Sequence, residues 1–183
     1  GLTMNEASDS ELRRARGNEI AIIFQDAQSA LTPTMTIGDQ IVELFRAHRD
    51  MTQDEAELAA VETLRKVLPE PVEIARSYPF QLSGGMAQRA LIAMSMALEP
   101  AVVIADEPTS SLDASVREEM LSWLEEMRDD RDVAVLLITH DLGVVARFAD
   151  RVAVMYAGQI VETADVRTIF RAPKHPYTYG LLQ

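Results

Sequence analysis

The sequence contains no cysteine, so neither disulfide bonds nor cysteine-ligated metals can stabilise the fold. It has no apolar run near the roughly 20 residues that span a bilayer, so we expect any link to a membrane to run through a partner protein. An N-terminal apolar signal region is also missing, since residues 8–16 are polar and charged. With 183 residues, 48% of them hydrophobic, the composition is that of a globular domain with a sizeable core.

Positive charge is scarce as well. The formal net charge is -12, and only Lys66 and Lys174 among the 17 basic residues are lysines. A surface built to bind nucleic acid would be basic, because most of its affinity comes from neutralising phosphates. The charge therefore predicts no nucleic-acid partner.

Four segments have the pattern of β-strands. Residues 19–24 (EIAIIF) predict a strand that leads into Gln25. Residues 101–105 (AVVIA) and 133–139 (VAVLLIT) are short continuous apolar runs, typical of strands buried on both faces, and 152–156 predicts a third such strand. Ala157-Gly158 then predicts a tight turn into 159–162.

Helical patterns fill the stretch between the first two strands. Residues 27–33 are expected to form a loop, and 36–49 show helical spacing of apolar residues. Thr52 followed by Glu55 is a capping-box pattern that opens a helix ending near residue 68. Ser83 stands at an N-cap position, ahead of a helix that ends near residue 98.

Strands that alternate with helices indicate an α/β domain around a mostly parallel sheet. The helix-only stretch interrupts this alternation and predicts an inserted helical subdomain. We expect residues 1–31 and 101–183 to form the sheet domain, and residues 32–100 to form the helical subdomain.

The segment 82–89 (LSGGMAQR) carries the most specific pattern in the chain. A capping serine, Ser83, with Gly84 and Gly85 at a helix start leaves backbone N–H groups exposed at the positive end of the helix dipole. The missing side chains also allow a phosphate to approach the backbone. Alone, Ser-Gly-Gly would indicate only a capped helix.

An acidic pair, Asp106-Glu107, follows the apolar run 101–105. The carboxyl ends of parallel strands are where α/β sheets bind ligands. Asp106 can hold Mg²⁺ beside nucleotide phosphates, and Glu107 can polarise or deprotonate an attacking water. The alternative is two acids making local caps, which is weakened by Pro108 because a proline stiffens the turn that aims them.

Two further polar residues end predicted strands. His140, after the run 133–139, can reach a phosphate or its attacking water, and Gln25 can bind a metal or a water. Taken singly, each would be read as an ordinary structural or surface side chain.

In order along the chain, Gln25, LSGGMAQR, VVIADEPTSSLD and LLITHD resemble the Q-loop, signature motif, Walker B with D-loop, and switch histidine of ATP-binding cassette ATPases. The resemblance covers essentially the whole chain. It implies an α/β fold: a P-loop NTPase (RecA-like) core with a parallel sheet, incomplete at its N-terminus, and an inserted α-helical subdomain. It also implies ATP and Mg²⁺ as cofactors.

The resemblance assigns a role to each matching residue. The catalytic residues would be Glu107 as general base, His140 as the γ-phosphate contact and Gln25 as the sensor of Mg²⁺ and water. Asp106 and Gln25 would be on the metal side. The nucleotide-binding set would be Ser83, Gly84, Gly85 and Gln88 of the signature, which faces ATP held by a second subunit, with Asp106 and the interface residue Asp113.

Further stretches resemble the peptide/nickel importers of the dipeptide and oligopeptide type, among them residues 20–41, 138–162 and 175–182 (HPYTYGLL). This resemblance implies uptake of peptides, nickel or other small solutes, and a peripheral position at the cytoplasmic face of the cell membrane. The implied partners are a second ATPase subunit, identical or paralogous, and two transmembrane permease subunits. An extracytoplasmic solute-binding protein would act indirectly.

Such an ATPase needs the loop G-x-x-x-x-G-K-[ST] well upstream of Gln25, and the sequence has no lysine before Lys66. We therefore expect the chain to be a fragment that is inactive by itself. Three alternatives remain: a non-enzymatic interaction module, a chromosome-maintenance or DNA-repair ATPase, and a cassette exporter. The second is disfavoured because only residues 26–81 separate the Q-loop from the signature, without a heptad pattern.

Overall fold

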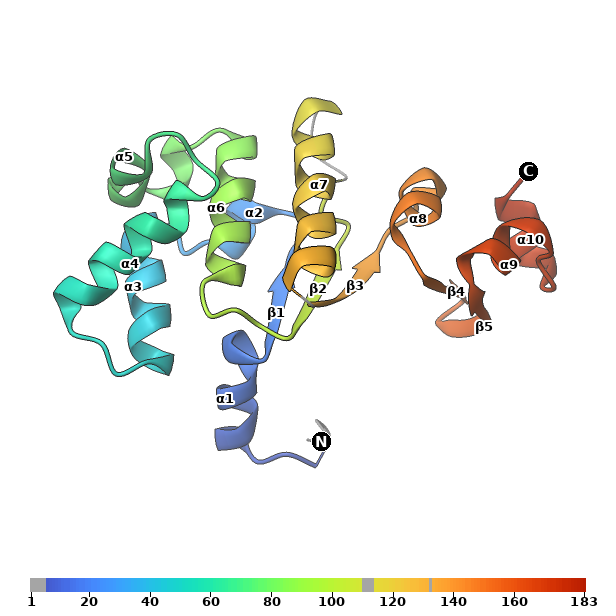
Figure 1. Cartoon of the computed structure of the whole chain (residues 1–183), viewed down its shortest axis with the longest axis horizontal. Coiled ribbons are helices and arrows are strands. Elements are labelled where there is room, and N and C mark those ends of the chain that lie inside the picture. The colour runs from blue at the N-terminus through green and yellow to red at the C-terminus, as the bar shows by residue number, and fades with distance from the viewer. Residues whose placement is uncertain (1–5, 110–113, 132) are drawn as a thin grey trace. The chain divides into compact units, whose positions relative to one another are not determined.

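The computed structural model describes residues 6–109, 114–131 and 133–183 (Figure 1). The chain divides into two compact units, Gly1–Ile138 and Thr139–Gln183. The predicted interface residue Asp113 lies outside the described residues. Within the described ranges, no helix is long and apolar enough to cross a membrane.

The described part of the first unit contains a three-stranded sheet and a group of helices. In chain order its elements are α1 (Asp9–Asn18), β1 (Ile20–Ile23), α2 (Ala27–Ala30), α3 (Ile37–His48), α4 (Gln53–Arg65), α5 (Pro71–Arg76), the 3₁₀ turn η1 (Pro79–Gln81), α6 (Gly84–Met96), β2 (Val102–Asp106), α7 (Ala114–Arg131) and β3 (Ala134–Ile138).

The sheet is parallel throughout, in the order β1-β2-β3. Helix α6 packs against β1 and helix α7 against β3. One face of the sheet is buried, with Ile23 and Val103 fully covered, whereas Leu136 is 55% exposed on the opposite face. The prediction that residues 133–139 form a strand is confirmed, but the prediction that both faces are buried is wrong. Ile22 and Leu136 both pair with Ile104 and are both exposed, so in the described sheet it is this face, and not the edge position of β3, that lacks cover.

Helices α3 to α6 share one hydrophobic core, which includes Ile41, Leu64 and Leu91. In Figure 1 the helices α3, α4 and α5 gather on the side of α6 that faces away from the strands. The predicted caps are confirmed: Thr52 forms a capping box with Glu55, and the Ser83 hydroxyl accepts from a backbone amide of the first turn of α6. The division into a sheet domain and a helical subdomain stays a prediction.

The expected loop at 27–33 contains a helix instead. The Asp26 side chain accepts hydrogen bonds from the backbone amides of Gln28 and Ser29 and so caps α2. An aspartate at this position satisfies donors that a helix start leaves without partners. The prediction of a plain loop was wrong because α2 is too short to show a helical period.

The second unit contains α8 (Leu142–Phe148), β4 (Arg151–Tyr156), β5 (Gln159–Asp165), α9 (Val166–Arg171) and α10 (Pro176–Leu181). Strands β4 and β5 form an antiparallel hairpin. Ala157 and Gly158 both have positive φ, 48° and 78°, as a tight two-residue hairpin turn requires, so the predicted turn is confirmed. The prediction that 152–156 is a strand buried on both faces is wrong, because Met155 and Tyr156 are 60% and 53% exposed.

Candidate functional site

Gln25 and Glu107 meet at the carboxyl edge of the sheet. β1 and β2 are adjacent and parallel, and Ile23 pairs with Ala105, so the residues that follow the two strands emerge side by side. The Gln25 Nε2 donates a hydrogen bond to the Glu107 Oε2 at 3.4 Å, across 82 positions of sequence. The structure therefore brings together two of the three residues predicted to be catalytic.

Glu107 has an unusual backbone conformation. Its φ is 42°, in the left-handed region that residues with a side chain rarely adopt. Its backbone N–H donates to the Ile138 carbonyl at 2.9 Å, which ties the turn after β2 to the end of β3. Its side chain is half-buried, so the carboxylate can still reach a water beside the sheet.

Asp106 is the exposed last residue of β2, directly before Glu107. Among the described residues, no cluster of three or more His, Asp or Glu side chains could hold a metal ion. Mg²⁺ does not need such a cluster, because it is commonly bound by one or two carboxylates together with phosphates and waters. The carboxylate of Asp106 and the amide of Gln25 are oxygen donors of this kind, so the residues fit Mg²⁺ bound with a nucleotide.

The N-cap Ser83 and the first residue Gly84 are exposed at the start of α6, and Gly85 is half-buried. The Ser83 Oγ accepts a hydrogen bond from the Met86 N–H at 3.3 Å. A Cβ built on Gly84 would meet no atom within 4 Å, and one on Gly85 would meet only the Val116 side chain, at 3.4 Å or more. Neither glycine has a positive φ. In the described chain, neither the backbone conformation nor close packing therefore requires a glycine at position 84. The missing side chain leaves space for a group from another molecule.

Gln88 lies one turn further along α6 and points inward. Its side chain is 2% exposed, and its Nε2 donates to the Pro108 carbonyl at 3.5 Å. The next residue, Arg89, forms an ion pair with Glu119 of α7. The structure thus gives Gln88 a protein partner, and its predicted contact with nucleotide stays a prediction.

His140 belongs to the second unit and is exposed. Its neighbour Asp141 is the N-cap of α8, accepting from the Gly143 and Val144 amides at 2.9 and 3.2 Å. This cap fixes the backbone beside the histidine. The role of His140 toward a phosphate stays a prediction.

Asp26 was not among the predicted site residues, although it follows Gln25 directly. Hydrogen bonds from the Ser29 hydroxyl and amide, and one from the Gln28 amide, lower the pKa of its carboxyl. The charged cap holds the chain just after Gln25 in a fixed turn. An aspartate three residues before a serine is a recognisable cap signal, and it could have revealed this residue.

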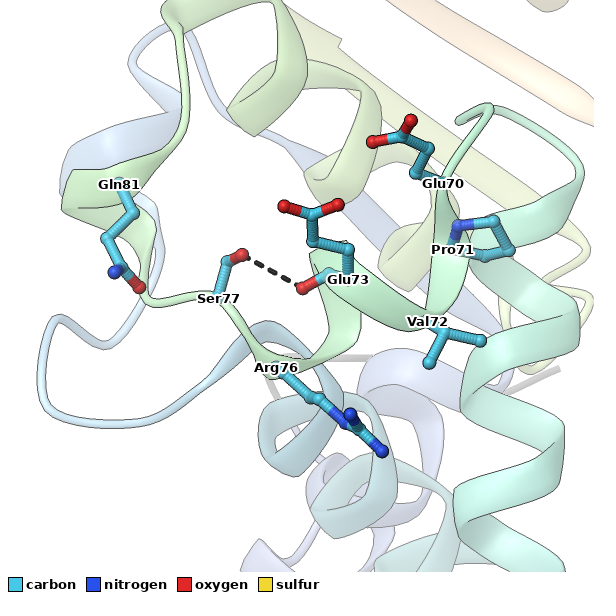
Figure 2. A pocket seen from close by; sticks show the side chains of 7 residues that line it. All are labelled: Glu70, Pro71, Val72, Glu73, Arg76, Ser77 and Gln81. Atoms are coloured by element: carbon cyan, nitrogen blue, oxygen red, sulfur yellow. Dashed lines mark hydrogen bonds between the residues drawn. The ribbon is translucent and has the colours of Figure 1, made fainter.

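A surface pocket of about 630 Å³ lies beside α5, and none of these residues lines it. Figure 2 shows the carboxylates of Glu70 and Glu73 on one side of α5 and the Arg76 side chain on the other. Just beyond it, Tyr78 and Phe80 stack with ring centroids 5.5 Å apart, and Phe80 is 71% exposed. The surface formed by α5 and the segment that leads into α6 therefore combines acidic groups with exposed aromatic rings.

The parallel sheet carries acidic residues at its carboxyl edge. A group of helices lies between β1 and β2 in the chain, and its last helix begins with Ser-Gly-Gly. These features define a P-loop NTPase core of the ATP-binding cassette type. A family model described as ABC transporter matches residues 2–110, more than half of the chain. The chain belongs to the ABC transporter family.

Several curated proteins are similar over nearly the whole chain. The oligopeptide transport ATP-binding protein OppD of Bacillus subtilis (strain 168) is 48% identical over 183 residues, which cover 100% of this chain and 51% of OppD. The dipeptide transport ATP-binding protein DppD of the same organism is 49% identical over 96% of this chain and 52% of DppD. The chain thus spans about half the length of these relatives.

A solved structure has the same fold. The dimeric post-hydrolysis state of the ATP-binding cassette MJ0796, bound to ADP and Pi, superposes with a TM-score of 0.78 at 27% sequence identity. The match covers 91% of this chain and 71% of the other.

Proposed function

We propose that the chain is the part of an ABC importer ATPase that carries the general base and the signature motif, and that the whole protein couples ATP hydrolysis to uptake of peptides or other small solutes. The observation that carries this proposal is the contact between Gln25 and Glu107 at the carboxyl edge of β1 and β2. The names of the relatives support the cargo class, since OppD and DppD are oligopeptide and dipeptide transport proteins.

Glu107 acts as the general base in this proposal. A carboxylate that accepts a hydrogen bond from Gln25 is held at one position, from which it can take a proton from the attacking water. Gln25 orients the carboxylate and the water with its amide. Asp106 and Gln25 would hold Mg²⁺ beside the phosphates, and the ion would supply positive charge that offsets the charge of the transferred group.

The start of α6 binds the γ-phosphate of ATP held by a second subunit. The exposed Ser83 hydroxyl and the first N–H groups of α6 are donors at the positive end of a helix. Gly84 leaves open space in front of them. His140 contacts the γ-phosphate within its own subunit, and Asp113 lies at the subunit interface.

The helices between residues 32 and 100, with the segment around Gln25, dock on a transmembrane permease, which places the protein peripherally at the cytoplasmic face of the membrane. Exposed aromatic side chains are enriched at protein interfaces, and Tyr78 and Phe80 provide such a pair close to the signature helix. Motion of this region on ATP binding would pass directly to the permease.

A segment exchange tests the proposal. Residues 1–183 would replace the aligned residues of the Bacillus OppD relative, which supplies the rest of its own chain. We expect the chimaera to restore oligopeptide uptake in a strain lacking OppD, and Glu107→Gln in the chimaera to abolish uptake while the protein still accumulates. An abundant chimaera that binds ATP and hydrolyses none would contradict the proposal.

The 183-residue chain alone should bind Mg-ATP poorly, because it lacks the loop that cradles the phosphates. Isothermal titration should therefore show no binding at low micromolar nucleotide. Robust ATP turnover by the isolated chain would show that the missing loop is not needed.

A further inference from the structure

The backbone of Glu107 needs support from its surroundings. A residue with a side chain at φ 42° is strained, and it keeps this conformation only where neighbouring contacts impose it. On the N-terminal side that contact is the hydrogen bond from the Glu107 N–H to the Ile138 carbonyl at 2.9 Å. The C-terminal side of the turn, which begins at Pro108, needs a second stabilising contact.

Gln88 provides this second anchor. Pro108, the residue after Glu107, is fully buried, and its carbonyl accepts the hydrogen bond from the Gln88 Nε2. Because Gln88 is only 2% exposed, water hardly competes for either group. Two hydrogen bonds, one from the Glu107 N–H itself and one to the carbonyl of the next residue, therefore hold the backbone that orients the Glu107 carboxylate.

The helix that carries Gln88 is itself fixed to the same part of the sheet domain. Arg89 pairs with Glu119 of α7, and a Cβ built on Gly85 would lie only 3.4 Å from the Val116 side chain. α6 is thus held against the start of α7, close to the turn after β2. A shift of α6 along its axis would move the Gln88 amide relative to Pro108.

We propose that Gln88 is a positioning residue for the general base: its buried amide holds the Pro108 carbonyl, and through it the left-handed Glu107, in the orientation that hydrolysis requires. This inference rests on the proposed function. Ser83 caps the same helix five positions earlier. Gln88 therefore also links the group that binds the partner's nucleotide with the base that acts on the nucleotide of its own chain.

The test uses the whole protein and the variant Gln88→Met, which keeps the length and burial of the side chain and removes the donor. We expect kcat for ATP to fall about tenfold, a part of the 10²–10⁴ that a well-placed general base contributes, with KM within about twofold of wild type. Gln88→Glu, which sets a charged acceptor against the Pro108 carbonyl, should lower kcat further. Ser95→Ala is the matched control, because this α6 hydroxyl bonds Leu91 and Ile22 carbonyls away from the turn, and its kcat should match wild type.

A double-mutant cycle separates positioning from general destabilisation. In a Glu107→Gln background, Gln88→Met should leave the residual single-turnover rate unchanged, because the base through which it acts is absent. An equal fold-loss in both backgrounds, or an unchanged kcat for Gln88→Met alone, would overturn the inference. A wild-type protein without ATPase activity would defeat the proposed function and this inference with it, whereas an active wild type with an equally active Gln88→Met defeats the inference alone.

Discussion

The carboxylate of Glu162 fixes the entry to α10 in the second unit. It accepts hydrogen bonds from the backbone amides of Lys174 and His175 at 2.8 and 3.0 Å, twelve and thirteen residues further along the chain. The Thr178 hydroxyl, followed by these two amides, lowers the pKa of the Glu162 carboxyl below its usual 4.5. The charged form is thus favoured in the folded unit.

This pKa shift gives a pH prediction. A carboxyl whose pKa is lowered by folding contributes stability above its unfolded pKa, and that contribution is lost as the pH falls through the lower folded pKa. The Lys174 and His175 amide proton resonances should therefore titrate together, with a midpoint below 4.5. NMR titration measures this, and Glu162→Gln should abolish the transition. A midpoint at or above 4.5 would contradict the role assigned to Glu162.

Individual site residues could be predicted where a local pattern carries them. Gln25 and Glu107 each follow an apolar strand, and parallel strands deliver such residues to one edge of a sheet, so the pattern could mark both as candidates. The inward orientation of Gln88 did not follow. Its burial depends on the fit of α6 against a turn twenty positions later, and no local sequence signal reports such a fit.

At the scale of elements, Gly38 sets how closely α3 and α5 pack. A Cβ at this position would lie 2.7 Å from the Ala75 carbonyl oxygen and 3.1 Å from the Ala75 Cβ. A backbone carbonyl cannot swing aside as a flexible side chain can. The two helices would have to separate.

Gly38→Ala should therefore destabilise the chain. Overpacking costs about 1–3 kcal/mol, which exceeds the gain of at most ~1 kcal/mol from replacing glycine by alanine in a helix. Urea unfolding measures the loss. Gly84→Ala is the matched control, since its Cβ meets nothing within 4 Å, and its free energy of unfolding should fall by no more than about 0.5 kcal/mol below wild type. Equal stability of the two variants would mean that α3 and α5 separate freely.

The exposed face of the sheet predicts self-association of the chain. Ile22, Phe24, Leu136 and Ile138 are all 42–55% exposed, and an apolar edge strand such as β3 is a template for pairing with another chain. Leu136→Glu should lower the apparent mass at high protein concentration in sedimentation experiments. Leu58→Glu, at an equally apolar residue on α4 that is 70% exposed, should change it little. The same effect from both variants would show that general hydrophobicity, not the sheet face, drives association.

The capped helix starts and the positions of the strands could be predicted from sequence, whereas the burial of the strands could not. Caps are local, so Thr52 and Ser83 mark helix starts correctly. Burial is not local: residues 133–139 are as apolar as 101–105, yet Leu136 and Ile138 are exposed on the face of the described sheet that lacks cover. The length of an apolar run cannot report how many elements cover it.

At the scale of the whole molecule, the proposed roles divide between two sites. Glu107 directly follows a sheet strand and would act on ATP bound by its own subunit. Ser83 opens a helix whose first residues face open space, and would act on ATP bound by the partner. A γ-phosphate that is enclosed between Glu107 on one side and the start of α6 on the other therefore requires two chains.

Tethered pairs of the whole protein test this division. Glu107→Gln should permit ATP-driven pairing and stall hydrolysis, whereas Ser83→Arg should obstruct the phosphate. If both substitutions lie on one subunit, each of the two sites carries one lesion. If each subunit carries one substitution, both lesions fall in a single site and the other site is intact. The second arrangement should therefore retain more ATPase activity, provided that one intact site can hydrolyse ATP while the other site is inactive. Equal activity in the two arrangements would leave no support for the action of Ser83 across the interface.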